Sequence, residues 1–280
     1  MKRKAFLIPG LTGFLLFFVL PCGIIIYYAM IDNAANHHFV GLQQFVKVCR
    51  NKAFVLAFTN TIKFTVTAVP LAVLLSLGLA AILDSRMPFI QNVRACFLCP
   101  MMVPAASVIL VWRVFFDQKG VVNQMMTFAG GEAVDWLRSD YGLGVLVFLF
   151  LWKNLGYNMI VFMAALANVP REALEVAQIE GASSFMTFWK IKRFYISPTI
   201  VFVTLLSLMN SFKIFREAYL LTGDYPYQGL YLLQHFMNNT FLAMDYQKMS
   251  AAAILIALVM IVVLSILFFV EKHMGKDLEE

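Results

Sequence analysis

Six long apolar runs constrain the fold of this chain more than any other feature. A helix needs about 20 residues to cross the hydrocarbon core of a bilayer. The runs are too long and too continuous for the ten-residue alternation of a membrane barrel. We therefore expect an all-α integral membrane protein, one multi-pass domain over residues 1–280 with six transmembrane helices. The expected spans lie near 6–30, 58–83, 95–116, 142–167, 195–221 and 249–270.

The composition excludes a soluble globular protein. Hydrophobic residues make up 61% of the chain and charged residues 14%, and the mean hydropathy is +0.78. A soluble domain has about 25% charged residues, so the bilayer must solvate this surface. The N-terminal MKRK and the first apolar run imitate a secretory signal. The run is long for a signal and has no small-x-small cleavage site, so we expect it to remain as a helix that Pro9 and Pro21 can kink.

Lysine and arginine in the connections predict the orientation in the membrane. One set of connections, which includes both ends of the chain, has eleven of these residues, and the opposite set has six. Because cytoplasmic loops are enriched in positive charge, both termini and the 169–193 loop are predicted to be cytoplasmic. The net charge of +6 fits the anionic inner leaflet, so no nucleic-acid partner is expected. The larger set is Lys2, Arg3, Lys4, Arg86, Arg94, Arg171, Lys190, Lys192, Arg193, Lys272 and Lys276.

Several chemistries have no sequence support. The four cysteines and four histidines form no ligand cluster, so we expect no metal site and no catalytic residue. A phosphate-binding G-x-x-x-x-G-K-[ST] loop is absent, because the one Gly-Lys pair, Gly275-Lys276, precedes Asp277. The chain should therefore bind no cofactor and hydrolyse no ATP. Apart from Glu217, every carboxylate falls in a loop or tail, which disfavours a proton-coupled carrier.

The 169–193 loop has the pattern of a helical hairpin. Pro170 suits a helix start, and Gly181 suits the left-handed position after a helix end. Ser183 or Ser184 can cap a second, aromatic-rich helix. On pattern alone, an interfacial amphipathic hairpin with solvated glutamates is an equally good interpretation.

Within that loop, the run EVAQIEGASSFMTFWKI resembles the EAA motif of permease subunits from binding-protein-dependent ABC importers. Two positions depart from the motif: Val176 replaces an alanine, and Phe194 stands where proline is usual, although Pro198 matches a second proline. Glu180 stands where aspartate is usual. The matching residues are Glu175, Ala177, Gly181 and Ala182.

The resemblance extends over nearly the whole chain, to the first permease subunit of maltose-like and glycerol-phosphate-like systems. The segments FVGLQQFVKV, NTIKFTVTAVPLAVLLSLGLA, LCPMMVPAASVILVWRVFF, LWKNLGYNMIVFMAAL and LLTGDYP match in order. This resemblance implies the type I ABC importer permease fold, with residues 172–190 as coupling helices. It also implies a second homologous permease subunit and two ATPase subunits that bind ATP and Mg. A periplasmic or lipid-anchored binding protein would deliver a carbohydrate, most simply an oligosaccharide. The resemblance further implies a location in the bacterial inner membrane.

The resemblance also implies roles for individual residues. The ATPase-coupling residues would be Glu172, Glu175, Ala177, Glu180, Gly181 and Ala182, with Glu175 contacting the ATPase and Gly181 setting the angle between the two helices. The pathway-lining positions would include Leu155, Gly156, Met159, Ser207, Asn210 and Ser211.

Two polar stripes lie within the apolar spans. Ser207, Asn210 and Ser211 recur at helical spacing, as do Asn154 and Asn158. Neutral donors and acceptors suit sugar hydroxyls, so we include both stripes in the candidate pathway; hydrogen bonding between helices is the alternative role.

Charged residues at Lys153, Lys213 and Arg216 leave the substrate charge open. Lys213 or Arg216 can pair with Glu217, or attract an anionic solute such as a glycerol phosphate, although we favour a neutral oligosaccharide. A membrane scaffold that docks a cytoplasmic protein without transport is the alternative from another class.

Overall fold

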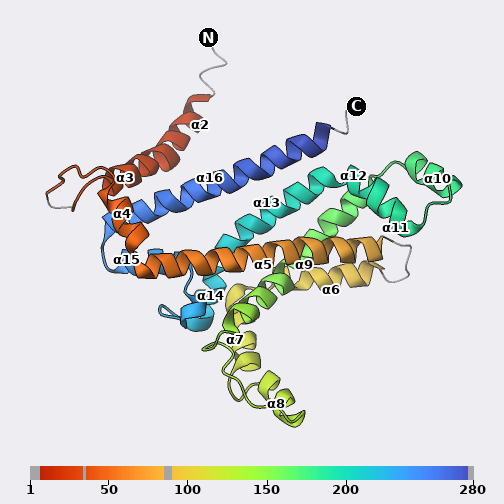
Figure 1. Ribbon diagram of the computed structural model, residues 1–280, viewed down its shortest axis with the longest axis horizontal. Coiled ribbons are helices and arrows are strands. Elements are labelled where there is room, and N and C mark those ends of the chain that lie inside the picture. The colour runs from red at the N-terminus through yellow and green to blue at the C-terminus, as the bar shows by residue number, and fades with distance from the viewer. Residues whose placement is uncertain (1–6, 34–35, 85–89, 277–280) are drawn as a thin grey trace. The chain divides into compact units, whose positions relative to one another are not determined.

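The computed structural model describes residues 7–33, 36–84 and 90–276, and these are mostly helical (Figure 1). Within these ranges there is no β-strand, only an isolated bridge between Ile31 and Phe39. The all-α prediction is therefore confirmed. The helices are α2 (Leu7–Phe14), η1 (Leu15–Val19), α3 (Leu20–Ala29), α4 (Gln43–Arg50), α5 (Lys52–Leu83), α6 (Ile90–Met102), α7 (Ala105–Phe116), α8 (Val121–Phe128), α9 (Gly142–Ala167), α10 (Arg171–Ile179), α11 (Ser184–Thr187), η2 (Phe188–Lys192), α12 (Arg193–Tyr195), α13 (Ser197–Lys213), α14 (Phe215–Thr222), η3 (Gln228–Leu230), α15 (Leu233–Leu242) and α16 (Tyr246–Lys276).

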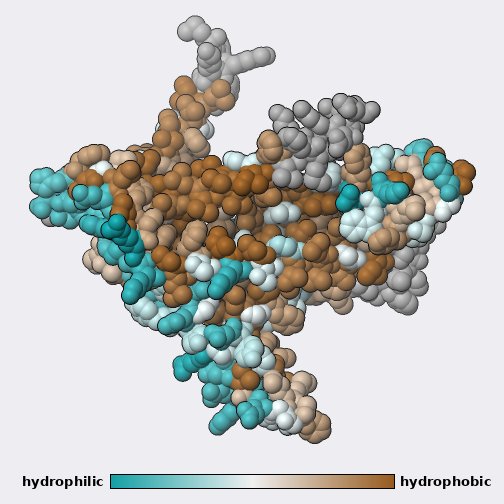
Figure 2. Space-filling model, in the orientation of Figure 1, coloured by the Kyte–Doolittle hydropathy of each residue, from teal (hydrophilic) through white to brown (hydrophobic). Residues whose placement is uncertain are grey.

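Five of the predicted spans are helices long and apolar enough to cross a membrane. Their bounds differ from the predicted ones by a few residues, apart from an earlier start for the second span. The first span continues through the π-helical segment η1, so it is one helical stretch with a local irregularity. The space-filling view shows apolar side chains over the long helices (Figure 2). The spans are Leu7–Ala29, Lys52–Leu83, Gly142–Ala167, Ser197–Thr222 and Tyr246–Phe269.

The third predicted span, 95–116, falls on a bent pair of helices rather than on one straight helix. Its two halves, Arg94–Met102 and the segment that begins at Ala105, meet at an angle of 101°. The break falls at Val103–Pro104. Proline lacks an N–H and disfavours a helical conformation in the residue before it, and Pro104 is extended, with ψ 137°. Counted as one broken span, the bent pair brings the candidate spans among the described residues to six.

Contacts within the chain divide it into two compact units. The first comprises residues 1–58 and 232–263, and the second comprises residues 59–231 and 264–280. The single-domain organisation over residues 1–280 stays a prediction.

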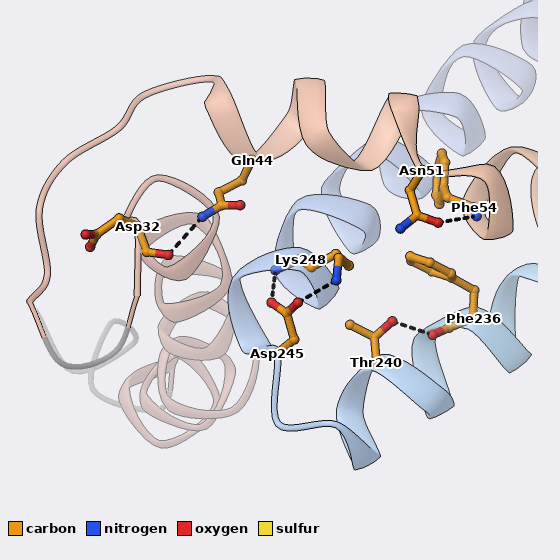
Figure 3. A network of polar contacts seen from close by, with 8 residues as sticks. All are labelled: Asp32, Gln44, Asn51, Phe54, Phe236, Thr240, Asp245 and Lys248. Atoms are coloured by element: carbon orange, nitrogen blue, oxygen red, sulfur yellow. Dashed lines mark hydrogen bonds and ion pairs between the residues drawn. The ribbon is translucent and has the colours of Figure 1, made fainter.

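The first unit is stabilised by side chains that satisfy backbone groups at helix ends (Figure 3). Gln44 is buried, and its amide nitrogen Nε2 donates to the carbonyls of Ile31 and Asp32, each at 3.0 Å. Asn51 Oδ1 accepts from the backbone of Phe54 at the start of α5, at 3.2 Å. Asp245 does the same for Lys248 at the start of α16, at 3.1 Å. These bonds fix the turns between helices, because unpaired amide groups at helix ends are costly to bury.

The core of the second unit lies between α5, α9 and α13. Val69 and Val73 of α5, Phe162 of α9 and Val203 of α13 belong to one buried apolar cluster. Helix α6 packs on α9 at Gly156. A Cβ atom at Gly156 would lie 1.8 Å from the carbonyl oxygen of Phe97, so the two helices approach as closely as their backbones allow.

Candidate functional site

Helix α10 ends in a glycine turn that sets the direction of the hairpin. Gly181 has a φ of +74°, a left-handed conformation that glycine adopts without steric cost. The N–H of Gly181 donates to the carbonyl of Gln178 at 3.0 Å, and that of Ala182 to Ala177 at 2.9 Å. This pair of bonds is the Schellman motif, which satisfies the last carbonyls of the helix. The predicted left-handed role of Gly181 is confirmed.

The second arm of the hairpin is capped by Ser183, one of the two predicted caps. Its hydroxyl accepts from the backbone N–H of Met186 at 3.3 Å. The arm is not a uniform α-helix, because the π-helical segment η2 separates α11 from α12. Within the arm, the guanidinium of Arg193 lies over the ring of Trp189, 5.3 Å from its centroid.

An ion pair joins the second arm to the end of α5. Lys192 Nζ contacts the carboxylate of Asp84, which directly follows that helix. Both side chains are partly buried, so the pair is better shielded from water than a surface ion pair. Sequence reasoning missed this partner, because 108 residues separate the two positions. The pair connects the hairpin to a transmembrane helix other than the two that flank it.

The hairpin presents an apolar surface with carboxylates around it. Ile179 is 86% exposed and Phe185 is 73% exposed, and Val176 is also exposed. Exposed apolar side chains of this size mark a contact surface for another protein or for a membrane. Among the predicted coupling residues, Glu172, Glu175, Glu180 and Gly181 are exposed and Ala182 is half-buried; only Ala177 is buried, inside the hairpin.

The two polar stripes face each other across α9 and α13. Asn158 Nδ2 donates to Ser207 Oγ at 2.9 Å, and Asn210 Nδ2 donates to Asn154 Oδ1 at 2.9 Å. Ser211 donates to its own helix, at Leu208, and lies 3.3 Å from Thr65 of α5. The stripes therefore bond the helices together.

The candidate pathway residues divide by burial. Gly156, Asn158, Met159, Ser207 and Ser211 are buried. Asn154, Leu155 and Asn210 are half-buried. Asn154 and Asn210 line a cavity of about 330 Å³, which the other six do not reach.

Charged side chains also line this cavity. Glu217, 3% exposed, forms an ion pair with Lys153, and its Oε1 lies 3.6 Å from Arg216 Nη2. The sequence indicated Arg216 or Lys213 as the partner of Glu217, but it is Lys153 that makes the close contact. The available signal was that Lys153 and Glu217 both interrupt apolar spans, where charges require partners.

We predict that removing one partner of the Lys153–Glu217 pair lowers the stability of the chain strongly, whereas replacing both partners by apolar residues changes it little. Glu217→Gln leaves the ammonium of Lys153 without its close counter-ion, and should lower the free energy of unfolding by about 3 kcal/mol. The double variant Lys153→Met/Glu217→Leu should lie within about 1 kcal/mol of the parent. Thermal unfolding in lipid nanodiscs measures both.

Lys248→Met is the matched control for this prediction. Lys248 pairs with Asp245 at 2.6 Å, but both side chains are about one-third exposed, so the loss should stay below about 1 kcal/mol. An equal loss in Glu217→Gln and Lys248→Met would contradict the prediction.

Comparisons with known proteins agree with this geometry. The family profile described as "Binding-protein-dependent transport system inner membrane component" matches residues 91–279. The arabinooligosaccharides transport system permease protein AraP of Halalkalibacterium halodurans is 30% identical over 188 residues, which cover 65% of this chain and 58% of AraP. The lactose transport system permease protein LacF of Rhizobium radiobacter is 29% identical over 238 residues, which cover 82% of this chain and 80% of LacF.

Among solved structures, a chain of a bacterial ABC transporter involved in the import of the acidic polysaccharide alginate has a similar fold. The TM-score is 0.85 at 22% identity, and the match covers 97% of this chain and 95% of that one. The fold and the hairpin thus define a multi-pass permease subunit of an ABC importer. The chain belongs to the family of binding-protein-dependent transport system inner membrane components.

Proposed function

We propose that this chain forms half of the transmembrane pathway of an ATP-driven importer that takes up a carbohydrate, most simply an oligosaccharide. The observation that carries the proposal is the hairpin of residues 171–195, which presents exposed apolar and acidic side chains around a left-handed glycine turn. The family match and the sugar-transporting relatives support the same function.

In this importer, ATP is hydrolysed by other subunits and not by this chain. Two ATPase subunits bind ATP and Mg, and the hairpin surface around Glu172, Glu175 and Glu180 contacts one of them. Closure of the ATPase dimer moves the hairpin as a rigid lever. The Lys192–Asp84 ion pair links the hairpin to the end of α5. Part of the motion of the hairpin is therefore transmitted to α5. A second permease subunit forms the other half of the pathway.

The orientation that this function requires follows the charge pattern. The hairpin and both termini lie in the cytoplasm, and the segments between α7 and α9 and between α14 and α16 face outward, toward a periplasmic or lipid-anchored binding protein. Lys2, Arg3, Lys4 and Arg86, which contribute to the charge bias, lie outside the described residues.

The solute passes beside the Asn154–Asn210 contact. Both amides line the 330 Å³ cavity with Tyr157, so a sugar ring there meets amide groups and an aromatic side chain. Asn158, Ser207 and Ser211 form the next polar positions along the same helices, and become accessible when α9 and α13 separate. Leu155, Gly156 and Met159 would border this path.

The test is transport by the isolated complex. A tag on this chain should retain a second permease and an ABC ATPase when membranes are solubilised. In proteoliposomes, labelled oligosaccharides should accumulate only when ATP and the binding protein are both present. Accumulation driven by a proton gradient without ATP would refute the proposal. Retention of a cytoplasmic protein without transport of any solute would instead favour the scaffold alternative.

A further inference from the structure

We infer from the charge of two cavities that the transported carbohydrate is acidic, a saccharide that bears carboxylates. This inference rests on the proposed function and names the substrate class of the same pathway. The two cavities lie at opposite ends of α14, an eight-residue helix: Ile214 and Glu217 border the first, and Leu221 and Gly223 border the second.

The first cavity, beside Asn154 and Asn210, has more cations than carboxylates. Lys153, Lys213 and Arg216 line it, whereas Glu217 is the one acidic side chain among the described residues on its wall. Three positive groups against one negative group leave two positive charges. Glu217 contacts Lys153 closely and Arg216 at 3.6 Å, so a single carboxylate is shared between cations and cannot neutralise all three.

This surplus differs from charges on a solvated surface. Lys153 and Lys213 lie within segments apolar enough to span a membrane, and Arg216 follows one turn later in the same span. Charged groups at such places face a partner or a water-filled path. A solute with a carboxylate supplies the missing counter-charge, and an Arg or Lys hydrogen bond to a carboxylate is stronger than one between neutral groups.

The same cavity also offers neutral groups to sugar hydroxyls. Asn154 uses both ends of its amide, since its Nδ2 donates to Phe150 and its Oδ1 accepts from Asn210. Asn210 Oδ1 has no hydrogen-bond partner in the described part of the chain and lines the cavity, so it can accept from a hydroxyl. Cationic groups and an amide acceptor together match an acidic sugar better than a simple anion.

The second cavity, about 650 Å³, also has more cationic than acidic side chains on its wall. Arg113, Lys119 and Arg138 line it together with two carboxylates, Asp117 and Asp135. The carboxylates serve the loop itself: Asp117 accepts from the backbone of Lys119 at 3.0 Å, and Asp135 accepts from that of Arg138 at 3.1 Å. Asp140 and Asp224 are close in sequence to wall residues but do not line the cavity.

Hydrogen bonds of the buried Asn123 stabilise the wall of the second cavity. Asn123, 2% exposed, accepts from Val134 N and Trp136 Nε1, each at 3.0 Å, and donates to the carbonyl of Gln118 at 3.0 Å. These bonds hold the cationic loop in one conformation. Tyr225 and Tyr227 also line the cavity, and a sugar can pack on aromatic rings of this kind. A preorganised wall loses less conformational entropy when a ligand binds.

The experiment uses the complex isolated through a tag on this chain, in proteoliposomes with its binding protein. The probes are labelled uronate di- and trisaccharides, each paired with its carboxyl-reduced, neutral counterpart. Uptake of at least one uronate should exceed that of its counterpart by about tenfold or more, the effect of one lost charge-assisted hydrogen bond.

Permease variants separate this chain's contribution from that of the binding protein. Lys213→Gln/Arg216→Gln should lower uronate uptake about tenfold, whereas Lys213→Arg/Arg216→Lys, which keeps the charge, should retain most of it. Lys52→Gln removes an exposed charge that lines neither cavity and should leave uptake unchanged. Assembly of each complex is checked by size-exclusion chromatography.

Three results would overturn the inference. The first is uptake of the neutral sugars at the rate of the uronates or faster, which would leave the proposed function standing. The second is unchanged uronate uptake in Lys213→Gln/Arg216→Gln. The third is uptake of neither sugar class by a complex that transports another solute, which would refute the proposed function as well.

Discussion

Gly181→Val is expected to abolish substrate-stimulated ATPase activity while the complex still assembles. Gly181 has a φ of +74° at the turn of the hairpin. In this left-handed region an L-residue costs about 1–2 kcal/mol, and a β-branched side chain costs more. No atom lies within 4 Å of a Cβ built at Gly181, so the substitution meets no clash. The strain is relieved by changing φ, and the direction of the second arm changes with it.

The measurement is ATP hydrolysis by the reconstituted complex, with and without the substrate-loaded binding protein. The ATPase rate with the loaded binding protein should fall to the basal rate, because the second arm of the hairpin points in a new direction and no longer fits the ATPase surface. Gly181→Asn should retain part of the stimulation, because asparagine tolerates the left-handed conformation better than valine does.

Gly130→Val is the matched control. Gly130 also has a positive φ, +86°, and open space around its Cβ, but it lies in the loop after α8, far along the chain from the hairpin. The two variants introduce similar backbone strain, and only one should uncouple ATP hydrolysis. If Gly181→Val keeps normal stimulation, or if Gly130→Val loses as much, the lever role of the hairpin is wrong.

Local patterns predicted the hairpin and most helices well. Pro170, Gly181 and Ser183 act within a few residues of their own positions, so their roles follow from backbone chemistry that is visible in the sequence. The bounds of α9 match the predicted span, because a single long apolar run is flanked by polar segments at both ends. The break at Val103–Pro104 was missed because hydropathy stays high through the bend.

Pairings between distant residues could not be predicted. Spacing placed Asn154 and Asn158 on one helix face, but it could not indicate that they bond to Asn210 and Ser207. The same holds for Lys153, whose partner Glu217 is 64 residues away. Such contacts depend on which helices pack together and in what register, which periodicity within one helix does not determine.

Gly156 is a candidate pathway residue whose contact with a distant helix could not be predicted. The resemblance placed it on the solute path, where a small residue would leave room for a sugar. In the structure, it lies against the backbone of Phe97 at the contact of α6 and α9. A pathway residue and a packing residue respond differently to a small added side chain, so one substitution distinguishes the two roles.

Gly156→Ala is expected to destabilise the chain strongly. The added Cβ would lie 1.8 Å from the Phe97 carbonyl oxygen and 2.5 Å from its carbonyl carbon, and backbone atoms cannot rotate away as a flexible side chain can. Helices α6 and α9 must separate by more than an ångström, and the buried cluster around Phe162 of α9 loses its packing against Phe97 of α6. We expect a loss of about 3 kcal/mol, at the upper end of the usual cost of overpacking.

Gly144→Ala, on the same helix, is the matched control because nothing lies within 4 Å of its Cβ position. Alanine is the better helix former, so this variant should be as stable as the parent or more stable by about 0.5–1 kcal/mol. Thermal unfolding in nanodiscs compares the two, and solute uptake is measured alongside. If Gly156→Ala keeps the melting temperature of Gly144→Ala but loses uptake, Gly156 lines the path; if it loses both, the close contact of α6 and α9 explains the glycine, because the helices cannot pack around even one methyl group.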